Sequence, residues 1–222
     1  MPAARTPRTR GPGQKAGLSR RQILDAALDL VDRDGLAALT MRSLGAELGV
    51  EAMTLYHYVP TKDALLDGLV ERAFTLAAPD PDTSRPWQES LRDYAHGLYR
   101  GLLRHPGVLP LASSRPAVTP DLLDGVEGYL RMLTDAGLPL GRALHIINIL
   151  TLFVIGHATA AAQTSPSAKP SDSDAGATAW VADLDTERYP LLVEAARTGQ
   201  GTDDDERFAI AVEALVAGFG KP

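Results

Sequence analysis

The side chains with the most chemistry to offer lie between positions 40 and 62. Arg42 and Lys62 are cations, Thr40 and Tyr56 carry hydroxyl groups, and His57 carries an imidazole. An arginine can form two hydrogen bonds to a guanine edge or to a phosphate, and hydroxyl and ammonium groups bind phosphate oxygens. This combination of residue types predicts contacts with a polyanion.

Two short helices joined by a tight turn are expected to position these side chains. Thr40 can cap the first helix, and Gly49 supplies the backbone freedom of the turn before a second helix at about 51–58. The apolar residues that would hold the two helices together are Leu44, Leu48, Val50 and Leu55. The side chains left facing outward are Glu51, Ala52, Met53, Thr54, Tyr56 and His57. This is the helix-turn-helix pattern, whose second helix reads base edges in the major groove.

The remaining segments predict further helices, so the expected fold class is all-α. No segment alternates apolar and polar residues with the period of a strand. Ser19 can cap a first helix that Gly35 ends, with Gln22 in capping-box spacing. The other helices are expected near 61–78, 87–104, 120–136, 139–163, 187–198 and 204–219. The apolar stretch 143–162 contains His145, Asn148 and His157 and lacks flanking basic clusters, which favours a buried core or interface helix over a membrane span.

Composition excludes some classes of site and hides an asymmetry of charge. The 222 residues contain no cysteine, which excludes disulfides, thiol catalysis and zinc sites built on cysteine. The net charge is −6, yet residues 1–62 carry nine Lys/Arg against six Asp/Glu. Residues 1–18 form a basic arm that we expect to be disordered; it either meets a polyanion or only solubilises the chain. Residues 164–185 are expected to be a mobile loop because they begin with a Ser/Pro/Asp-rich run.

Residues 19–66 resemble the DNA-binding domain of the TetR family of transcriptional regulators. The resemblance rests on SRRQILDAALDLVDRDG, LTMRSLGAELGV and TLYHYVPTKDALL. One departure is Gly45, where the family usually carries Ala; we expect it to loosen the second helix slightly. A weaker resemblance to the tetracycline-repressor branch continues through WQESLRDYAHGLYRGLLRHPG, the Ser114-Arg115-Pro116 turn and AGLPLGRAL.

The resemblance implies a role in DNA binding for each residue singled out above. Arg42 would contact a base or a phosphate, and Thr40, Tyr56 and Lys62 would contact the backbone. Positions used for readout or positioning are Ala52, Met53, Thr54, His57 and Tyr58. Ala52 and Met53 cannot donate hydrogen bonds, so the operator should differ from the tetracycline operator. The alternatives are a solvated Arg42, a Tyr56 packed in the core, and a His57 and Tyr58 that lie off the DNA.

Residues 67–222 would form, by the same resemblance, a helical regulatory and dimerisation domain. The implied ligand-binding positions are Tyr94, Leu98, Arg115, Tyr129, Leu144, Ile147 and Thr151. The alternative for them is core packing, and for Arg115 it is a structural role in the turn at 114–116. The implied dimer interface uses 139–163 and the last helix, 206–219. The apolar residues of the last helix are Ala209, Ile210, Val212, Leu215, Val216 and Phe219.

No metal and no other cofactor is expected. The tetracycline repressors hold a magnesium–tetracycline chelate with His and Asn side chains. Here Tyr94 stands in place of the Asn, and Ala112 or Ser113 in place of the His. The expected effector is instead a mid-sized, largely apolar molecule with one or two polar groups.

The leading interpretation is a ligand-responsive DNA-binding regulator, most often a repressor in this family. It would act in the cytoplasm as a homodimer on a palindromic double-stranded operator. One alternative is an enzyme, against which stands the lack of a nucleophile elbow or a Gly-rich phosphate loop. Another is a carrier or adaptor that uses the helical domain alone. DNA binding that weakens steeply with salt separates the regulator from both.

Overall fold

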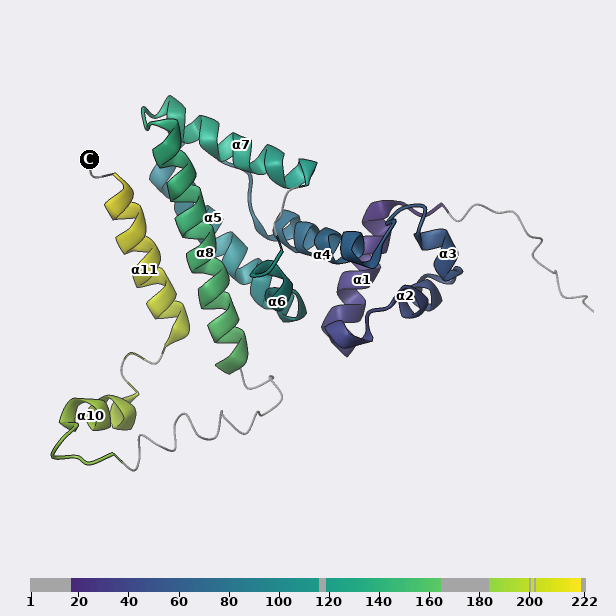
Figure 1. The fold of residues 1–222 in the computed structure, drawn as a ribbon. Coiled ribbons are helices and arrows are strands. Elements are labelled where there is room, and N and C mark those ends of the chain that lie inside the picture. Colours follow the sequence, from purple (N-terminus) through teal and green to yellow (C-terminus); the bar gives the residue numbers. More distant parts are fainter. Residues whose placement is uncertain (1–16, 116–118, 165–183, 200, 202, 221–222) are drawn as a thin grey trace, which may run out of the picture.

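The computed structural model describes residues 17–115, 119–164, 184–199, 201 and 203–220. The basic arm predicted at 1–18 and the mobile loop predicted at 164–185 lie almost entirely outside these residues. All regular elements in the described part of the chain are helices (Figure 1), which confirms the all-α prediction.

The N-terminal part consists of α1 (Arg20–Asp34), a 3-10 turn (Leu36–Ala38), α2 (Met41–Leu48), α3 (Ala52–Leu55) and α4 (Lys62–Ala77). Side-chain caps explain where three of these helices begin. Ser19, Thr40 and Thr61 each accept a hydrogen bond from the backbone N–H three residues further on. Gly49 ends α2 in the left-handed conformation, at φ 66°. The predicted caps Ser19 and Thr40 and the turn at Gly49 are therefore confirmed, whereas α3 is shorter than the helix predicted at 51–58.

The C-terminal part consists of α5 (Trp87–Arg104), a 3-10 turn (Pro106–Val108), α6 (Leu109–Ala112), α7 (Pro120–Asp135), α8 (Leu140–Thr164), α10 (Pro190–Thr198) and α11 (Asp204–Phe219). Helices α5, α8 and α11 pack side by side, α7 packs on α8, and α10 lies apart (Figure 1). The helices predicted at 87–104 and 204–219 have the same bounds in the structure, as α5 and α11.

Among the described residues, one helix, α8, is long and apolar enough to cross a membrane. A core helix of a folded domain passes the same test. Here α8 packs against α5, α7 and α11, and its fully buried residues are Ala143, Leu150, Val154 and Ala158. One face of α8 is therefore buried in the core, whereas other apolar side chains, among them Leu140, Ile149 and Leu152, are exposed.

Helix α4 belongs to both parts of the molecule. Arg20 on α1 binds Glu71 on α4 through two hydrogen bonds of 2.9 and 2.7 Å, and Glu71 is 5% exposed. Arg72 on α4 binds Asp25 on α1 at 2.5 Å. The domain boundary predicted between residues 66 and 67 therefore falls inside a continuous helix that is tied to α1.

Candidate functional site

The turn between α2 and α3 is closed by apolar packing and by a close backbone approach. Leu44 and Leu55 are completely buried between the helices. A Cβ atom on Gly45 would lie 2.8 Å from the carbonyl oxygen of Val50 and 3.2 Å from the backbone nitrogen of Ala52. The expectation that Gly45 only loosens α2 missed this contact, because the absent side chain is what lets α3 pack so closely.

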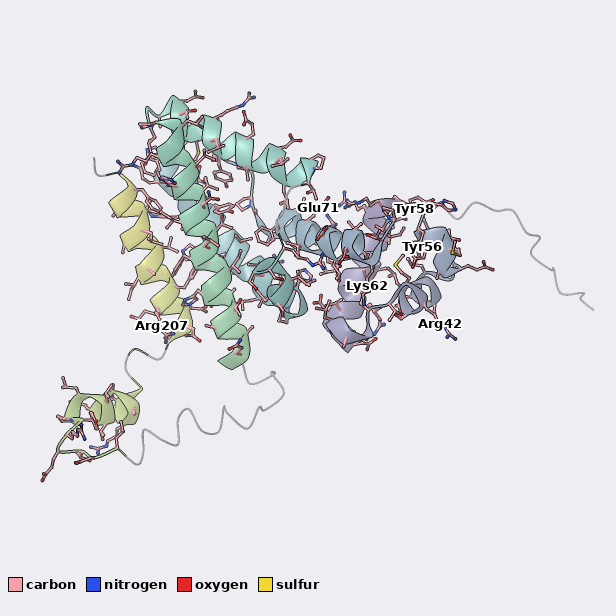
Figure 2. All side chains as sticks on the ribbon, in the orientation of Figure 1. Arg42, Tyr56, Tyr58, Lys62, Glu71 and Arg207 are labelled. Atoms are coloured by element: carbon pink, nitrogen blue, oxygen red, sulfur yellow. The ribbon has the colours of Figure 1, made fainter. Side chains whose placement is uncertain are left out.

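Most of the predicted DNA-binding residues are exposed on this part of the chain. The exposed residues are Thr40, Arg42, Met53, Tyr56, His57 and Lys62, with Met53 at 70%. Figure 2 shows Arg42 and Tyr56 at the end of the molecule remote from α8 and α11. Ala52, Thr54 and Tyr58 are half-buried, and Ala52 and Tyr58 pack partly against the core. The residues thus divide into an outward-facing group and a group that also holds α3 in place.

The cations of the N-terminal part divide into paired and unpaired side chains. Three arginines are bound by carboxylates: Arg20 by Glu71, Arg33 by Glu47 and Asp34, and Arg72 by Asp25. No carboxylate within the described residues pairs with Arg42, Lys62 or Arg21. Arg21, on the first turn of α1, is exposed like Arg42 and Lys62. Exposed cations without an internal partner are available to bind phosphate.

A second candidate site is a cavity of about 400 Å³ in the helical C-terminal part. Side chains from α4, α5, α6, α7 and α8 and from the segment after α4 line it. Among the predicted ligand-binding residues, those that line it are Tyr94, Arg115, Tyr129, Leu144, Ile147 and Thr151. Leu98 does not line it, because its side chain is completely buried in the core. The sequence analysis missed Phe74, Asp80 and Asn148, whose positions at the cavity depend on how the helices pack.

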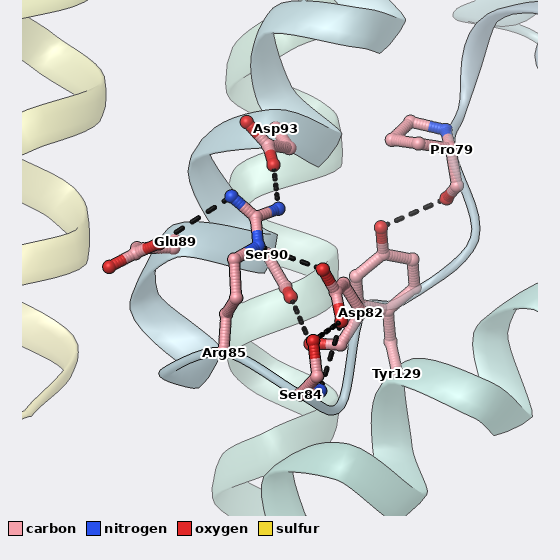
Figure 3. Close-up of polar contacts among 8 residues, drawn as sticks. All are labelled: Pro79, Asp82, Ser84, Arg85, Glu89, Ser90, Asp93 and Tyr129. Carbon is pink, nitrogen blue, oxygen red and sulfur yellow. Dashed lines mark hydrogen bonds and ion pairs between the residues drawn. The ribbon is translucent and has the colours of Figure 1, made fainter.

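Two tyrosines at the cavity are fixed by hydrogen bonds and by each other. The hydroxyl groups of Tyr94 and Thr151 lie 2.7 Å apart, and the Tyr129 hydroxyl donates to the carbonyl oxygen of Pro79 at 2.9 Å (Figure 3). The two rings meet edge to face, with centroids 5.0 Å apart. Burial raises the pKa of both Tyr94 and Tyr129 above the usual value of a tyrosine. Both hydroxyl groups are therefore neutral near pH 7.

Arg115 connects the cavity to α4. Its Nη1 donates to Asp67 at 2.7 Å and its Nη2 donates to Asp63 at 2.8 Å. These carboxylates raise the pKa of Arg115 further. The two roles considered from the sequence were a ligand contact and a support for the turn at 114–116. Arg115 lines the cavity, and its guanidinium also binds α4 at Asp63, one residue beyond Lys62, and at Asp67. The cavity wall and the DNA-binding part therefore share an ion-pair network.

The helices predicted to form a dimer interface expose apolar side chains. On α8 the exposed residues include Leu140, Ile149 and Leu152, and on α11 Ile210 is 63% exposed. The prediction for α11 needs a correction, since Val212 and Val216 are buried within the subunit. Leu215 and Phe219 are half-buried against the same core.

Comparison with known proteins identifies the family. Residues 23–69 match the family described as "Bacterial regulatory proteins, tetR family", and residues 79–221 match "Tetracyclin repressor-like, C-terminal domain". The chain belongs to the TetR family. Among TetR-family relatives, it is 34% identical to the class D tetracycline repressor of Escherichia coli, over 92% of this chain and 90% of that protein. It is 31% identical to the transcriptional repressor DrrR1 of Streptomyces coeruleorubidus, over 94% of this chain and 82% of that one.

A solved TetR-family structure has the same fold over most of the chain. ActR of Streptomyces coelicolor, in complex with actinorhodin, is 28% identical and superimposes with a TM-score of 0.75, covering 92% of this chain and 96% of that one. The chain is therefore a ligand-responsive DNA-binding transcriptional regulator of the repressor type, and not an enzyme.

Proposed function

We propose that this regulator represses transcription as a cytoplasmic homodimer on a palindromic operator, and that a small molecule in the cavity releases it. The observation that carries the proposal is the pairing of charges in the N-terminal part. Arg20, Arg33 and Arg72 are bound by carboxylates, whereas Arg42 and Lys62 are exposed beside the helix-turn-helix and pair with no carboxylate among the described residues.

Individual roles follow from exposure and side-chain chemistry. Arg42 binds a base edge or a phosphate, and Thr40, Tyr56 and Lys62 bind the DNA backbone. Met53, at 70% exposure, makes an apolar contact in the major groove. The proposed DNA-binding domain is 19–66 and the regulatory domain is 67–222, joined through α4.

A dimer is supported by the apolar side chains that α8 and α11 leave exposed. Leu152 and Ile210 are 69% and 63% exposed in the single subunit, and such surfaces are usually covered by a partner. A two-fold dimer presents two recognition helices to major grooves about 34–36 Å apart, which matches a palindromic operator.

The proposed release mechanism uses the contacts between the two parts. Arg115 lines the cavity and binds Asp63 and Asp67 on α4. At a second contact, the Nδ1 atom of His105 lies 2.6 Å from the Asp32 carboxylate on α1. His105 and Arg115 lie on either side of α6 in the chain, so a ligand that shifts α6 also displaces α4 and α1. This displacement changes the separation of the recognition helices. Because one equilibrium links the two sites, DNA must weaken the ligand by the factor by which the ligand weakens DNA.

The test is selection of duplex DNA from a random library by the purified full-length protein. We expect enrichment of an inverted repeat, and binding to it that weakens steeply with salt. A scrambled duplex of the same composition is the control. Failure to enrich any duplex, or equal affinity for the scrambled duplex, would contradict the proposal.

A further inference from the structure

Among the described residues, the cavity offers one charged group without a partner. Its charged lining residues are Arg115 and Asp80. Asp63 and Asp67 already bind the two terminal nitrogens of Arg115. Asp80 is exposed, and no hydrogen bond or ion pair engages it within the described part of the chain. The charge available to a ligand at this cavity is therefore negative.

The segment that carries Asp80 is anchored on both sides. Before it, the carbonyl oxygen of Pro79 accepts the hydrogen bond from Tyr129 at 2.9 Å. After it, the carbonyl oxygen of Asp82 accepts a hydrogen bond from the Ser90 hydroxyl at 2.8 Å (Figure 3). These two anchors fix the backbone on either side of Asp80, which lines the cavity.

The neighbouring carboxylates are neutralised, which distinguishes them from Asp80. Arg85 donates from Nε to Asp82 at 2.8 Å and also binds Asp93 and Glu89 (Figure 3). Hydrogen bonds from Ser84 and Arg85 hold the pKa of Asp82 below its usual range. Of the acidic residues on and beside this segment, Asp80 is the one left to balance a charge brought in by a ligand.

The walls near Asp80 also suit a cation. The rings of Tyr94, Tyr129 and Phe74 line the cavity, and the electron-rich faces of aromatic rings attract cations. Both tyrosine hydroxyl groups are already engaged, with Thr151 and with Pro79. The exposed amide of Asn148 remains to bind a carbonyl or hydroxyl group.

We infer that the effector is an organic cation: a largely apolar molecule whose ammonium group pairs with Asp80 and packs against the tyrosine rings. The inference rests on the proposed function and narrows its ligand class. An anionic ligand would be repelled by Asp80 and would find the guanidinium of Arg115 already occupied, so the site discriminates by charge.

Three compounds with one ring system and different charges test the inference. They are 9-(aminomethyl)anthracene, a cation at pH 7; 9-anthracenemethanol, which is neutral; and 9-anthracenecarboxylate, an anion. Fluorescence titration of the full-length protein without DNA gives their Kd values. We expect the amine to bind at least about threefold more tightly than the alcohol, a modest factor because Asp80 is exposed, and the carboxylate to bind most weakly.

Asp80→Asn assigns the preference to this carboxylate. It should bring the Kd of the amine close to that of the alcohol and leave the Kd of the alcohol unchanged, which also shows that the cavity is intact. Asp135→Asn is the matched control, an exposed aspartate at the end of α7 that does not line the cavity. Equal or tighter binding of the carboxylate, or a preference for the amine that survives Asp80→Asn, would overturn the inference. Because no DNA is present, the result stands apart from any failure of operator binding.

Discussion

Replacing Ile210 by aspartate should dissociate the dimer. Ile210 lies on α11 and is 63% exposed in the subunit, although it is a large apolar side chain. If α11 lies in the interface, the dimer covers this surface twice, once in each subunit. The substitution therefore removes two buried apolar side chains and places two carboxylates in an apolar environment.

The magnitude follows from the area left to bury. Burying a whole isoleucine side chain is worth about 1.5–3 kcal/mol, so the exposed part of Ile210 is worth about 1–2 kcal/mol in each subunit. Both copies together give about 2–4 kcal/mol, which raises the Kd of the dimer by about 30-fold to about 1000-fold. The cost of burying two carboxylates adds to this loss.

Sedimentation equilibrium across a range of protein concentrations measures the Kd of the dimer directly. Leu123→Asp is the matched control, because Leu123 is 51% exposed on α7, outside the proposed interface. Operator affinity should fall together with dimer stability for Ile210→Asp and stay unchanged for Leu123→Asp. A dimer Kd unchanged by Ile210→Asp would by itself refute the assignment of the interface to α11.

Three further predictions concern the ion pairs and the cavity. Asp63→Asn combined with Asp67→Asn removes both carboxylate partners of Arg115. The double variant should reduce the factor by which 9-(aminomethyl)anthracene changes operator affinity. A factor equal to that of the unmodified protein would show that Arg115 does not couple the cavity to the DNA-binding part. Tetracycline should not release the operator at micromolar concentration with or without magnesium, because no histidine lines the cavity in the described residues and the resemblance puts Ala112 or Ser113 in place of the metal-binding His. Magnesium-dependent release in a fluorescence-anisotropy titration would contradict this. The free energy of unfolding should fall as the pH rises above about 10, because the tyrosines ionise there in the unfolded chain while the raised pKa values of Tyr94 and Tyr129 keep them neutral in the folded one. Denaturant titrations should show a shallower fall of this free energy with pH for Tyr94→Phe. An identical dependence on pH in the variant would argue against the burial of that hydroxyl.

Local signals in the sequence were enough to predict the longer helices, although α6 was not predicted and α3 is shorter than expected. Ser19, Thr40 and Thr61 cap the helices they precede, and Gly49 ends α2, because each acts through atoms only a few residues away. The helices predicted at 87–104 and 204–219 have the bounds of α5 and α11 for the same reason. The resemblance to the family added what local signals lack, namely which positions on separate helices face one cavity.

Contacts between residues far apart in the chain could not be predicted from the sequence. Arg115 binds Asp63 and Asp67, about fifty positions earlier in the chain, and no spacing rule indicates such a pair. Periodicity shows that Val212 and Val216 are on an apolar face, but it does not say whether a neighbour in the subunit or a second copy covers that face. For the same reason Leu98 was predicted to contact the ligand, although its side chain is completely buried in the core.

The most direct test of DNA binding by the α2–α3 part compares three variants on the selected operator across a range of salt concentrations. Arg42→Ala should lose about 1–3 kcal/mol of binding free energy, and Lys62→Ala should lower the salt slope by about one. Arg33→Ala should bind as the unmodified protein does, because Glu47 at 3.0 Å and Asp34 at 3.1 Å already bind that guanidinium. Equal affinities for the Arg42→Ala variant and the unmodified protein, or a loss confined to Arg33→Ala, would contradict the assignment of DNA binding to this surface.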